Sequence, residues 1–283
     1  MNWSNYHCHS NYCDGKGVLE DYIKEALMQG IKSFGFSSHA PVPFELVWAM
    51  SQRKLSNYIN EIDELKEKYK KNIQIYTGLE VDYIPGTMEP MHQDIVELSL
   101  DYTVGSVHFV DQFQDGTYFE VDGSRQVFVK AIDQLFSGNV RSLIQRYFEL
   151  VRKMLTESKP TILGHLDKIK IHNTAGMLFD ANTNWYMDEI RHTLEVLATS
   201  GTILEVNTRG LYKKKSNETY PSKWVLGEAL KKDIPVTINS DAHHPKEITS
   251  NFKSAASILR EIGYRSTYQL WDGEWKKSYL KPV

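Results

Sequence analysis

The most informative segment of the chain is residues 5–15, Asn5-Tyr6-His7-Cys8-His9-Ser10-Asn11-Tyr12-Cys13-Asp14-Gly15. On a β-strand, side chains alternate between the two faces, so His7 and His9 point the same way and Cys8 points the other way. Asp14 follows in a glycine-containing turn, which can bring its carboxylate back over the end of the strand. A lone His-x-His pair is usually a half-buried strand with two exposed histidines. The rest of the chain decides between that interpretation and a shared metal site.

Size and composition exclude several classes of protein. The chain has 283 residues, of which 41% are hydrophobic and 24% charged, as in ordinary globular proteins. The net charge of -3 gives no basic surface for nucleic acid. Two cysteines are too few for a disulfide scaffold. Residues 1–4 lack the pattern of a signal peptide, and no apolar run is long enough to cross a membrane. We therefore expect a cytoplasmic protein with no nucleic-acid or membrane partner.

Short apolar segments that alternate with amphipathic helices predict parallel βαβ units. The first strand lies in residues 5–15. The six further predicted strands are Ile31–His39, Ile73–Glu80, Asp101–His108, Thr161–His165, Thr202–Asn207 and Pro235–Asp241. No glycine-rich phosphate fingerprint follows any of them, which weakens a dinucleotide-binding interpretation. We predict an α/β fold, a distorted TIM-like (β/α)7 barrel, formed by a single domain over residues 1–283.

Three further segments carry specific structural expectations. Residues 109–125 are predicted to be a long loop that covers the site, with Phe109, Tyr118 and Phe119 as its walls. Pro221 is predicted to occupy the first position of a helix over 221–232. The aromatic tail, residues 268–279, is predicted to be a strand or a hairpin.

Metal-binding side chains recur at the ends of the predicted strands. In a barrel of parallel strands all carboxyl ends lie on one face, where active sites are found. Nine candidate ligands gather there: His7, His9, Asp14, His39, Glu80, His108, His165, Asp241 and His243. Imidazole together with carboxylate suits Zn, Mn, Fe or Co, and nine donors exceed what one four-coordinate ion needs. The sequence therefore predicts two or three divalent transition-metal ions, with a carboxylate such as Glu80 bridging a pair.

The order of these motifs resembles that of a known family. His7-x-His9, Cys13-Asp14-Gly15, Ser38-His39-Ala40, Gly78-Leu79-Glu80, Gly105-Ser106-Val107-His108, Gly164-His165 and Ser240-Asp241-Ala242-His243 are similar to the successive motifs of the PHP (polymerase and histidinol phosphatase) metal-dependent phosphoesterases. Within that family, residues 204–211, Tyr220-Pro221-Ser222 and Asp241-Ala242-His243 resemble the histidinol-phosphate phosphatases.

The resemblance implies a ligand scheme and a reaction. One ion would bind His7, His9, Glu80 and Asp241. A second would bind His108 and His165, with Glu80 as the bridge, and a third would bind Asp14, His39 and His243. The implied reaction is hydrolysis of a small phosphate monoester, with L-histidinol phosphate as the expected substrate. Glu80, Asp241 and His243 are the expected catalytic residues, because Asp241 or His243 could protonate the leaving alkoxide.

Three cationic residues are candidates for holding the substrate phosphate. Arg209 follows the sixth predicted strand and can act as a bidentate donor. Lys168 and Lys170, which come just after His165, are the other two candidates. Two alternatives stay open at this point: another phosphorylated metabolite or nucleotide as the substrate, and a non-catalytic metal-binding module.

Overall fold

The structure is a computed structural model, and it describes residues 3–280; Met1 and Asn2, part of the segment inspected for a signal peptide, lie outside the described residues. The strands are β1 (Ser4–Asn5), β2 (Ser33–Phe36), β3 (Gln74–Asp82), β4 (Tyr102–Ser106), β5 (Phe109–Gln112), β6 (Tyr118–Glu120), β7 (Ile162–Leu163), β8 (Ile203–Asn207), β9 (Val236–Asn239), β10 (Ser266–Trp271) and β11 (Glu274–Tyr279). The α-helices are α1 (Leu19–Met28), α2 (Gln52–Tyr69), α3 (Gln93–Val96), α4 (Arg125–Phe136), α5 (Val140–Glu157), α6 (Asn184–Ser200), α7 (Arg209–Tyr212), α8 (Lys223–Leu230) and α9 (Phe252–Ile262). The short 3₁₀ helices are η1 (Lys168–His172), η2 (Thr174–Gly176) and η3 (Pro245–Glu247).

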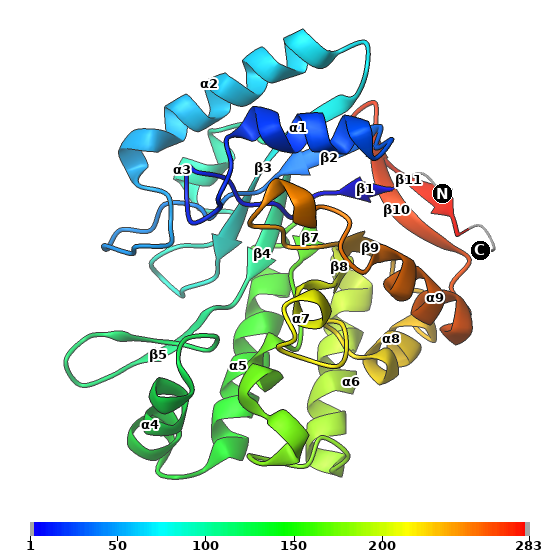
Figure 1. Cartoon of the computed structure of the whole chain (residues 1–283). Coiled ribbons are helices and arrows are strands. Elements are labelled where there is room, and N and C mark those ends of the chain that lie inside the picture. The colour runs from blue at the N-terminus through cyan, green and yellow to red at the C-terminus, as the bar shows by residue number, and fades with distance from the viewer. Residues whose placement is uncertain (1–2, 281–283) are drawn as a thin grey trace.

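Seven strands form one parallel sheet in the order β1-β2-β3-β4-β7-β8-β9 (Figure 1). The two edges meet just beyond the ends of β1 and β9. There the His9 amide donates to the Ala242 carbonyl at 2.8 Å, and the Ala242 amide donates to the His7 carbonyl at 3.1 Å. These bonds close the sheet into a barrel and carry the ligand-bearing segments of β1 and β9 side by side. The predicted (β/α)7 barrel is confirmed.

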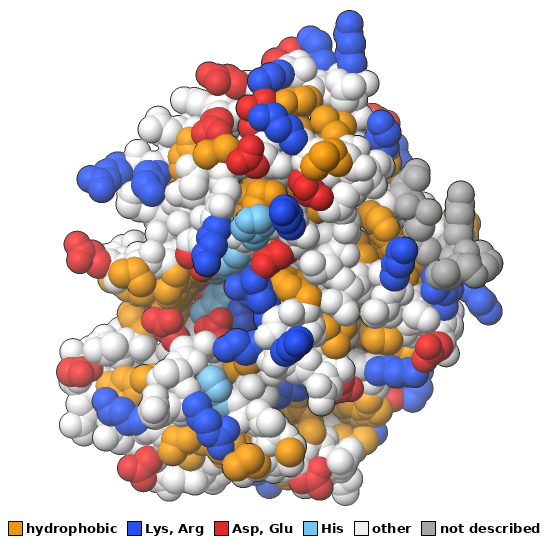
Figure 2. Space-filling view, in the orientation of Figure 1, with side chains coloured by type: hydrophobic (Ala, Val, Ile, Leu, Met, Phe, Trp, Pro, Cys, Tyr) orange, Lys and Arg blue, Asp and Glu red, His pale blue; other side chains and the backbone are white. Residues whose placement is uncertain are grey.

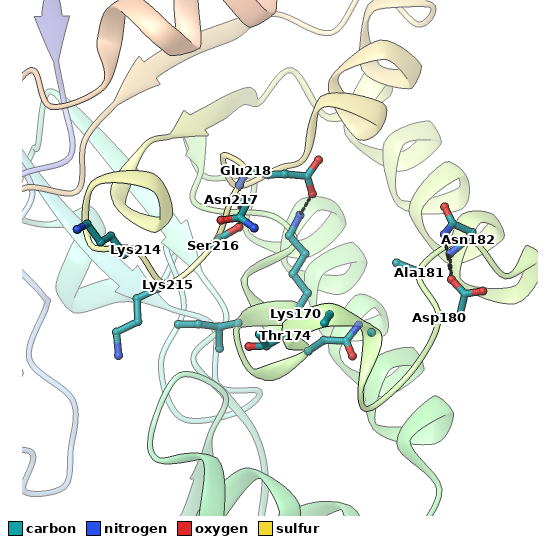
Figure 3. Close-up of a pocket in the computed structure, with 14 residues that line it drawn as sticks. Lys170, Thr174, Asp180, Ala181, Asn182, Lys214, Lys215, Ser216, Asn217 and Glu218 are labelled. Carbon is teal, nitrogen blue, oxygen red and sulfur yellow. Dashed lines mark hydrogen bonds and ion pairs between the residues drawn. The ribbon is translucent and has the colours of Figure 1, made fainter.

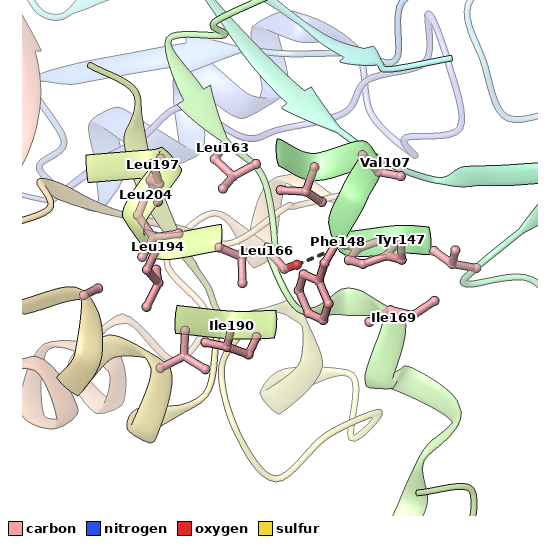
Figure 4. Packing of buried hydrophobic residues seen from close by; sticks show 14 of the residues in the cluster. Val107, Tyr147, Phe148, Leu163, Leu166, Ile169, Ile190, Leu194, Leu197 and Leu204 are labelled. Carbon is pink, nitrogen blue, oxygen red and sulfur yellow. Dashed lines mark hydrogen bonds between the residues drawn. The ribbon is translucent and has the colours of Figure 1, made fainter. Parts of the chain in front are cut away.

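The main core lies between the barrel and the long helices on one side of it. α5 and α6 run side by side (Figure 1), and their buried residues share one core with Leu163 of β7 and Leu204 of β8. Figure 4 shows Phe148 of α5 and Ile190 of α6 facing one another across Leu166, which follows β7. Tyr147 also donates its hydroxyl to the Leu166 carbonyl at 3.1 Å. The apolar faces of these helices hold β7, and with it His165, in place.

A tyrosine fills the inside of the barrel. Tyr102 of β4 is 2% exposed, and its hydroxyl lies 2.9 Å from the Tyr6 carbonyl and 2.8 Å from the Phe36 carbonyl. These partners follow β1 and end β2, neither of which neighbours β4, so the side chain must cross the barrel interior. Gly35 and Gly78 provide the space, because a Cβ at either position would lie 2.4–2.5 Å from Tyr102.

Two sequence expectations need correction. Residues 109–125 are not a plain loop, because β5 and β6 pair there as an antiparallel hairpin whose turn contains Gly116 at φ +83°. Pro221 is not the first helical residue, because α8 begins at Lys223 and Ser222 occupies the N-cap position. The hairpin predicted for the tail is confirmed as β10 and β11, which pair along their whole length.

Candidate active site

The structure brings all nine predicted ligands into one cluster at the carboxyl ends of the barrel strands. Figure 2 shows histidine side chains at the bottom of a hollow in this face, with basic and acidic side chains around it. Four overlapping groups have ligand atoms close enough to share an ion. They are His9, Asp14, His39 and His243; His7, Glu80 and His165; His7, His9 and Asp241; and His39, Glu80 and His108.

Glu80, near the end of β3, lies at the centre of the cluster and is 1% exposed. Its Oε2 lies 3.0 Å from His39 Nδ1, 3.2 Å from His7 Nε2 and 3.4 Å from His9 Nε2. Its Oε1 lies 3.0 Å from His165 Nε2 and 3.7 Å from His108 Nε2. Burial opposes ionisation, but the surrounding imidazoles hold the pKa of this carboxyl well below its usual range. An ionised carboxylate that faces five imidazoles with both oxygens has the geometry of a bridging ligand.

Several buried ring nitrogens in the cluster have no hydrogen-bond partner in the described part of the chain. His7 Nε2, His9 Nε2 and His39 Nδ1 are all in this state, although each faces Glu80. Buried polar atoms are normally satisfied, and leaving one unpaired costs about 1–3 kcal/mol. A cation placed between these nitrogens and the carboxylate would satisfy all of them. The residues present therefore fit bound metal ions.

Asp14 joins the cluster from the turn after the first strand. Its Oδ2 lies 3.1 Å from His243 Nε2, and its Oδ1 lies 3.9 Å from both His9 Nδ1 and His39 Nε2. Partial burial opposes ionisation, but these imidazoles lower the pKa of the Asp14 carboxyl. The predicted third group of Asp14, His39 and His243 is thus assembled, and His9 lies within the same group. Cys13 Sγ is 3.6 Å from His9 Nδ1, beside this group.

Asp241 approaches the cluster from the segment after β9. Its backbone is left-handed, with φ +53°, a conformation that is uncommon outside glycine and recurs at functional sites. This turn directs Oδ1 to 3.3 Å from His9 Nε2, while Asn207 donates to Oδ2 at 3.3 Å. Burial raises the pKa of Asp241, but Arg209 and His7 more than offset it and hold the pKa well below its usual range.

Two carboxylates that the sequence analysis missed orient His7 and His108. Each contacts the ring Nδ1, whereas the Nε2 of each ring faces Glu80. Glu205 of β8 lies 2.7 Å from His7 Nδ1 and accepts a 2.8 Å bond from the His165 amide. Asp82 of β3 lies 2.8 Å from His108 Nδ1. Metal-binding histidines commonly place their second ring nitrogen against such a carboxylate. Both were detectable, because Asp82 shares a strand face with Glu80 and Glu205 is a charge inside an apolar strand.

Of the three predicted phosphate-binding cations, two lie in the active-site pocket and the third lies elsewhere. Lys168 and Arg209 line a pocket of about 190 Å³ that opens onto the cluster. Lys168 Nζ lies 2.8 Å from Asp122 Oδ2 and 3.3 Å from His108 Nε2. Arg209 Nη1 donates to the Asp241 carbonyl and to His243 Nδ1, both at 2.7 Å.

Lys170 does not line this pocket. Figure 3 shows it beside Glu218 in a separate cavity of about 490 Å³. Its Nζ lies 2.8 Å from Asp167 Oδ2 and 3.5 Å from Glu218 Oε2. Both partners are acidic, so the charge of Lys170 is already compensated within the protein.

The pocket walls also differ from the expected ones. Phe109 and Phe119 are buried, and Tyr118 stacks on Phe44 outside the pocket. The walls that are not ligands or cations are instead Trp48, Glu120 and Asp122. No sequence pattern singled these out, because they come from irregular segments and a hairpin.

Comparison with known proteins identifies relatives along most of the chain. The PHP domain family matches residues 5–209. The histidinol-phosphatase of Bacillus subtilis is 30% identical over 258 residues, which cover 86% of this chain and 94% of that protein.

Solved structures share the fold. The Listeria monocytogenes HisK structure superimposes with a TM-score of 0.78 at 23% identity, covering 89% of this chain and 99% of that one. The histidinol phosphate phosphatase of Lactococcus lactis has a TM-score of 0.73 at 20% identity and covers 98% and 99% of the two chains. That structure contains zinc, L-histidinol and phosphate. Within residues 3–280 of the present chain, no helix has the length and apolar character needed to span a membrane.

Proposed function

This chain belongs to the PHP family, and from that premise we propose that it hydrolyses L-histidinol phosphate to L-histidinol and phosphate, a step of histidine biosynthesis. One observation carries the proposal: nine metal-binding donors, with Glu80 at their centre, form a cluster beneath a pocket that is also lined by Lys168 and Arg209. Metal donors beside fixed cations form a site for a phosphate group. The name of the Bacillus subtilis relative, histidinol-phosphatase, supports histidinol as the alcohol part of the substrate.

The cluster is proposed to hold two or three divalent ions, of zinc, manganese, iron or cobalt. Glu80 would be shared between ions, and His7, His9, Asp241, His108 and His165 would complete their ligands. Asp14, His39 and His243 would hold a further ion, with His9 beside them. Bound ions of this kind neutralise phosphate charge and activate water for in-line attack. Zinc in the Lactococcus lactis structure supports this choice of metals.

The chain's own residues are assigned the binding and proton-transfer roles. Lys168 and Arg209 would hold the phosphate oxygens from two sides of the pocket, since both line it and come from different elements. Asp241 and His243 are the candidates to protonate the leaving alkoxide. Because His243 Nδ1 accepts from Arg209, a proton on this ring would lie on Nε2, which is 3.1 Å from Asp14 Oδ2.

We further propose that residues 1–283 form a single PHP-type barrel domain that acts in the cytoplasm on a small phosphorylated substrate. The PHP match over residues 5–209 and the structural matches that extend to nearly the whole chain support one domain. The net charge of -3 argues against nucleic acid as a partner.

A phosphate-release assay on purified, metal-loaded protein tests the proposal. The panel contains L-histidinol phosphate, sugar phosphates and nucleoside monophosphates, and we expect the highest kcat/KM for L-histidinol phosphate. Glu80→Gln, which keeps the shape but removes the central charge, should lose at least one metal and most activity. A higher kcat/KM for another monoester would move the function to that substrate. No phosphate release from any panel member by fully metal-loaded protein would favour the non-catalytic alternative.

A further inference from the structure

The hydroxyl of Ser106 contacts the centre of the metal-binding cluster, and the ligand scheme does not use it. Ser106 ends β4, and its side chain is fully buried. Its Oγ donates a hydrogen bond of 2.6 Å to Glu80 Oε1. A bond this short is typical of a hydroxyl that donates to an ionised carboxylate, and it is about twice as strong as a bond between neutral groups. Ser106 therefore holds one oxygen of the residue around which the other ligands are arranged.

The two oxygens of Glu80 face different sides of the cluster. Oε2 lies 3.0–3.4 Å from three imidazole nitrogens, whereas Oε1 lies 3.0 Å from His165 Nε2 and 3.7 Å from His108 Nε2. A ring nitrogen that binds an ion directs a lone pair toward that ion and no longer donates to the carboxylate. Within residues 3–280, Ser106 is the only group besides the imidazoles that hydrogen-bonds a side-chain oxygen of Glu80. Its hydroxyl is therefore the donor that Glu80 keeps when ions are bound.

Two neighbouring strands hold the Ser106 hydroxyl in place. In the ladder between β3 and β4, Ser106 pairs with Asp82, two residues beyond Glu80, so these three side chains lie on one face of the sheet. On the other side, Gly164 follows β7, and a Cβ at that position would lie 2.6 Å from Ser106 Oγ. The hydroxyl thus occupies space that only a glycine leaves open. Its direction toward Glu80 is set by the barrel itself.

His165 is the predicted ligand that depends most on this arrangement. The Nδ1 atoms of His7 and His108 each contact a carboxylate, but His165 Nδ1 has no hydrogen-bond partner in the described part of the chain. Its ring is held at Nε2, which lies 3.0 Å from Glu80 Oε1 and 3.4 Å from Ser106 Oγ. The geometry on this side of the cluster therefore follows the oxygen that Ser106 fixes.

We propose that Ser106 is a positioning residue whose hydroxyl holds Glu80 Oε1 toward His108 and His165 and so determines how tightly this side of the cluster binds an ion. The inference rests on the proposed function for the presence of the ions and deepens it by one residue. A neutral serine hydroxyl is not among the usual ligands of zinc, so Ser106 acts through Glu80. Without the hydrogen bond, Oε1 could turn away and leave two imidazoles without their carboxylate.

Ser106→Ala removes the hydroxyl and little else. Loss of a group that orients a metal ligand typically weakens metal binding ten- to a hundred-fold, so zinc titration against a chromogenic chelator should show a loss of about that size for one ion. The affinity for any other ion should change by less than about threefold. Ser33→Ala is the matched control. Ser33 is also buried, at the start of β2, and its hydroxyl donates at 2.6 Å to the Leu270 carbonyl, so this variant should bind zinc like the wild type.

The pair Ser106→Thr and Ser106→Val separates the hydroxyl from the volume of the side chain. Threonine and valine have nearly the same shape, so strain from the added methyl group is common to both, and only threonine keeps a donor. The threonine variant should bind the affected ion roughly ten- to a hundred-fold more tightly than the valine variant. Equal affinities in this pair would show that packing, and not the hydrogen bond, supports the cluster, and would overturn the proposal. Wild-type zinc affinity in Ser106→Ala, or an equal loss in Ser33→Ala, would overturn it as well.

The outcome is distinguishable from a failure of the proposed function, because zinc titration requires no substrate. A wild type that prefers another monoester, combined with the expected zinc affinities of the Ser106 variants, would overturn the substrate assignment alone. The expected activity on L-histidinol phosphate, combined with an unchanged zinc affinity in Ser106→Ala, would overturn the role of Ser106 alone.

Discussion

At the residue scale, Glu205 shows how a buried charge can serve a site without touching the substrate. Besides its contacts with His7 and His165, it accepts amide hydrogens from Asn207 and Asn239, both at 3.0 Å. The Glu205 carboxylate lies 2.7 Å from His7 Nδ1, close enough to shift the pKa of His7. Burial alone lowers the pKa of His7, but Glu205, Glu80 and Asp241 raise it well above its usual range. Glu205 therefore fixes both the orientation and the basicity of a predicted ligand.

We expect Glu205→Gln to weaken zinc binding by roughly ten- to a hundred-fold, as is typical when such a supporting group is removed. Gln keeps the size and one acceptor but loses the charge that favours His7 as a ligand. Competition with a chromogenic chelator measures the affinity. Glu228→Gln removes a charge on α8 that is paired with Arg191 and Lys231 and lies outside the ligand cluster, so it is a suitable control and should bind zinc like the wild type. An unchanged affinity in Glu205→Gln would mean that the network is only structural.

Arg209 was expected to bind phosphate, and the structure adds that its guanidinium also contacts the proposed metal-binding cluster. Nη1 contacts His243 and the Asp241 carbonyl, whereas Nε and Nη2 have no partner in the described part of the chain. Arg209→Ala should lower kcat/KM roughly ten- to a hundred-fold through loss of a charged phosphate contact. It should also weaken metal binding at Asp14, His39 and His243.

Steady-state kinetics and elemental analysis of the Arg209 variants check both effects. Arg209→Lys should recover only part of the activity, because a point charge lacks the planar fork. A wild-type kcat/KM in Arg209→Ala would leave the phosphate to Lys168 and the ions.

At the element scale, the alternation of strands and helices could be predicted from the sequence because buried parallel strands are continuous apolar runs. The clustering of the candidate ligands could be predicted for the same reason, since a histidine or carboxylate ending such a run stands out. The walls of the pocket could not. Trp48 lies in an irregular segment, and Glu120 depends on a hairpin whose register is set by tertiary contacts. Neither follows a period of 2 or 3.6 residues.

The glycines of β2 and β3 show a constraint that sequence patterns do not reveal. Gly78→Ala would place a Cβ 2.5 Å from the Tyr102 ring. Overpacking of this kind typically costs about 1–3 kcal/mol, and we expect urea unfolding of the metal-loaded protein to show a loss in that range. Gly227→Ala is the control, because Gly227 lies inside α8 with no atom within 4 Å of its would-be Cβ. That change should stabilise by about 0.5–1 kcal/mol. Equal stability of the two variants would contradict the role of Gly78.

At the scale of the whole molecule, the ligand cluster joins nearly every strand of the barrel. His7, His39, His108, His165 and Asp241 follow β1, β2, β4, β7 and β9, and Glu80 lies within β3. Several of these strands are only two to five residues long. Bound ions would therefore supply cross-links at the carboxyl end that the short ladders lack. The barrel and its proposed chemistry would then depend on the same residues.

Removal of the metals should accordingly destabilise the whole fold. An ion present at a hundred times its dissociation constant contributes about 2.7 kcal/mol, which corresponds to roughly 5–10 °C in Tm for a chain of this size. Chelation followed by calorimetry should lower Tm by at least that amount, and zinc should restore it. Glu80→Gln should show a smaller shift, because it already binds less metal. If elemental analysis confirms that the ions are gone and Tm is unchanged, the cluster contributes to catalysis alone and the barrel is closed by its hydrogen bonds.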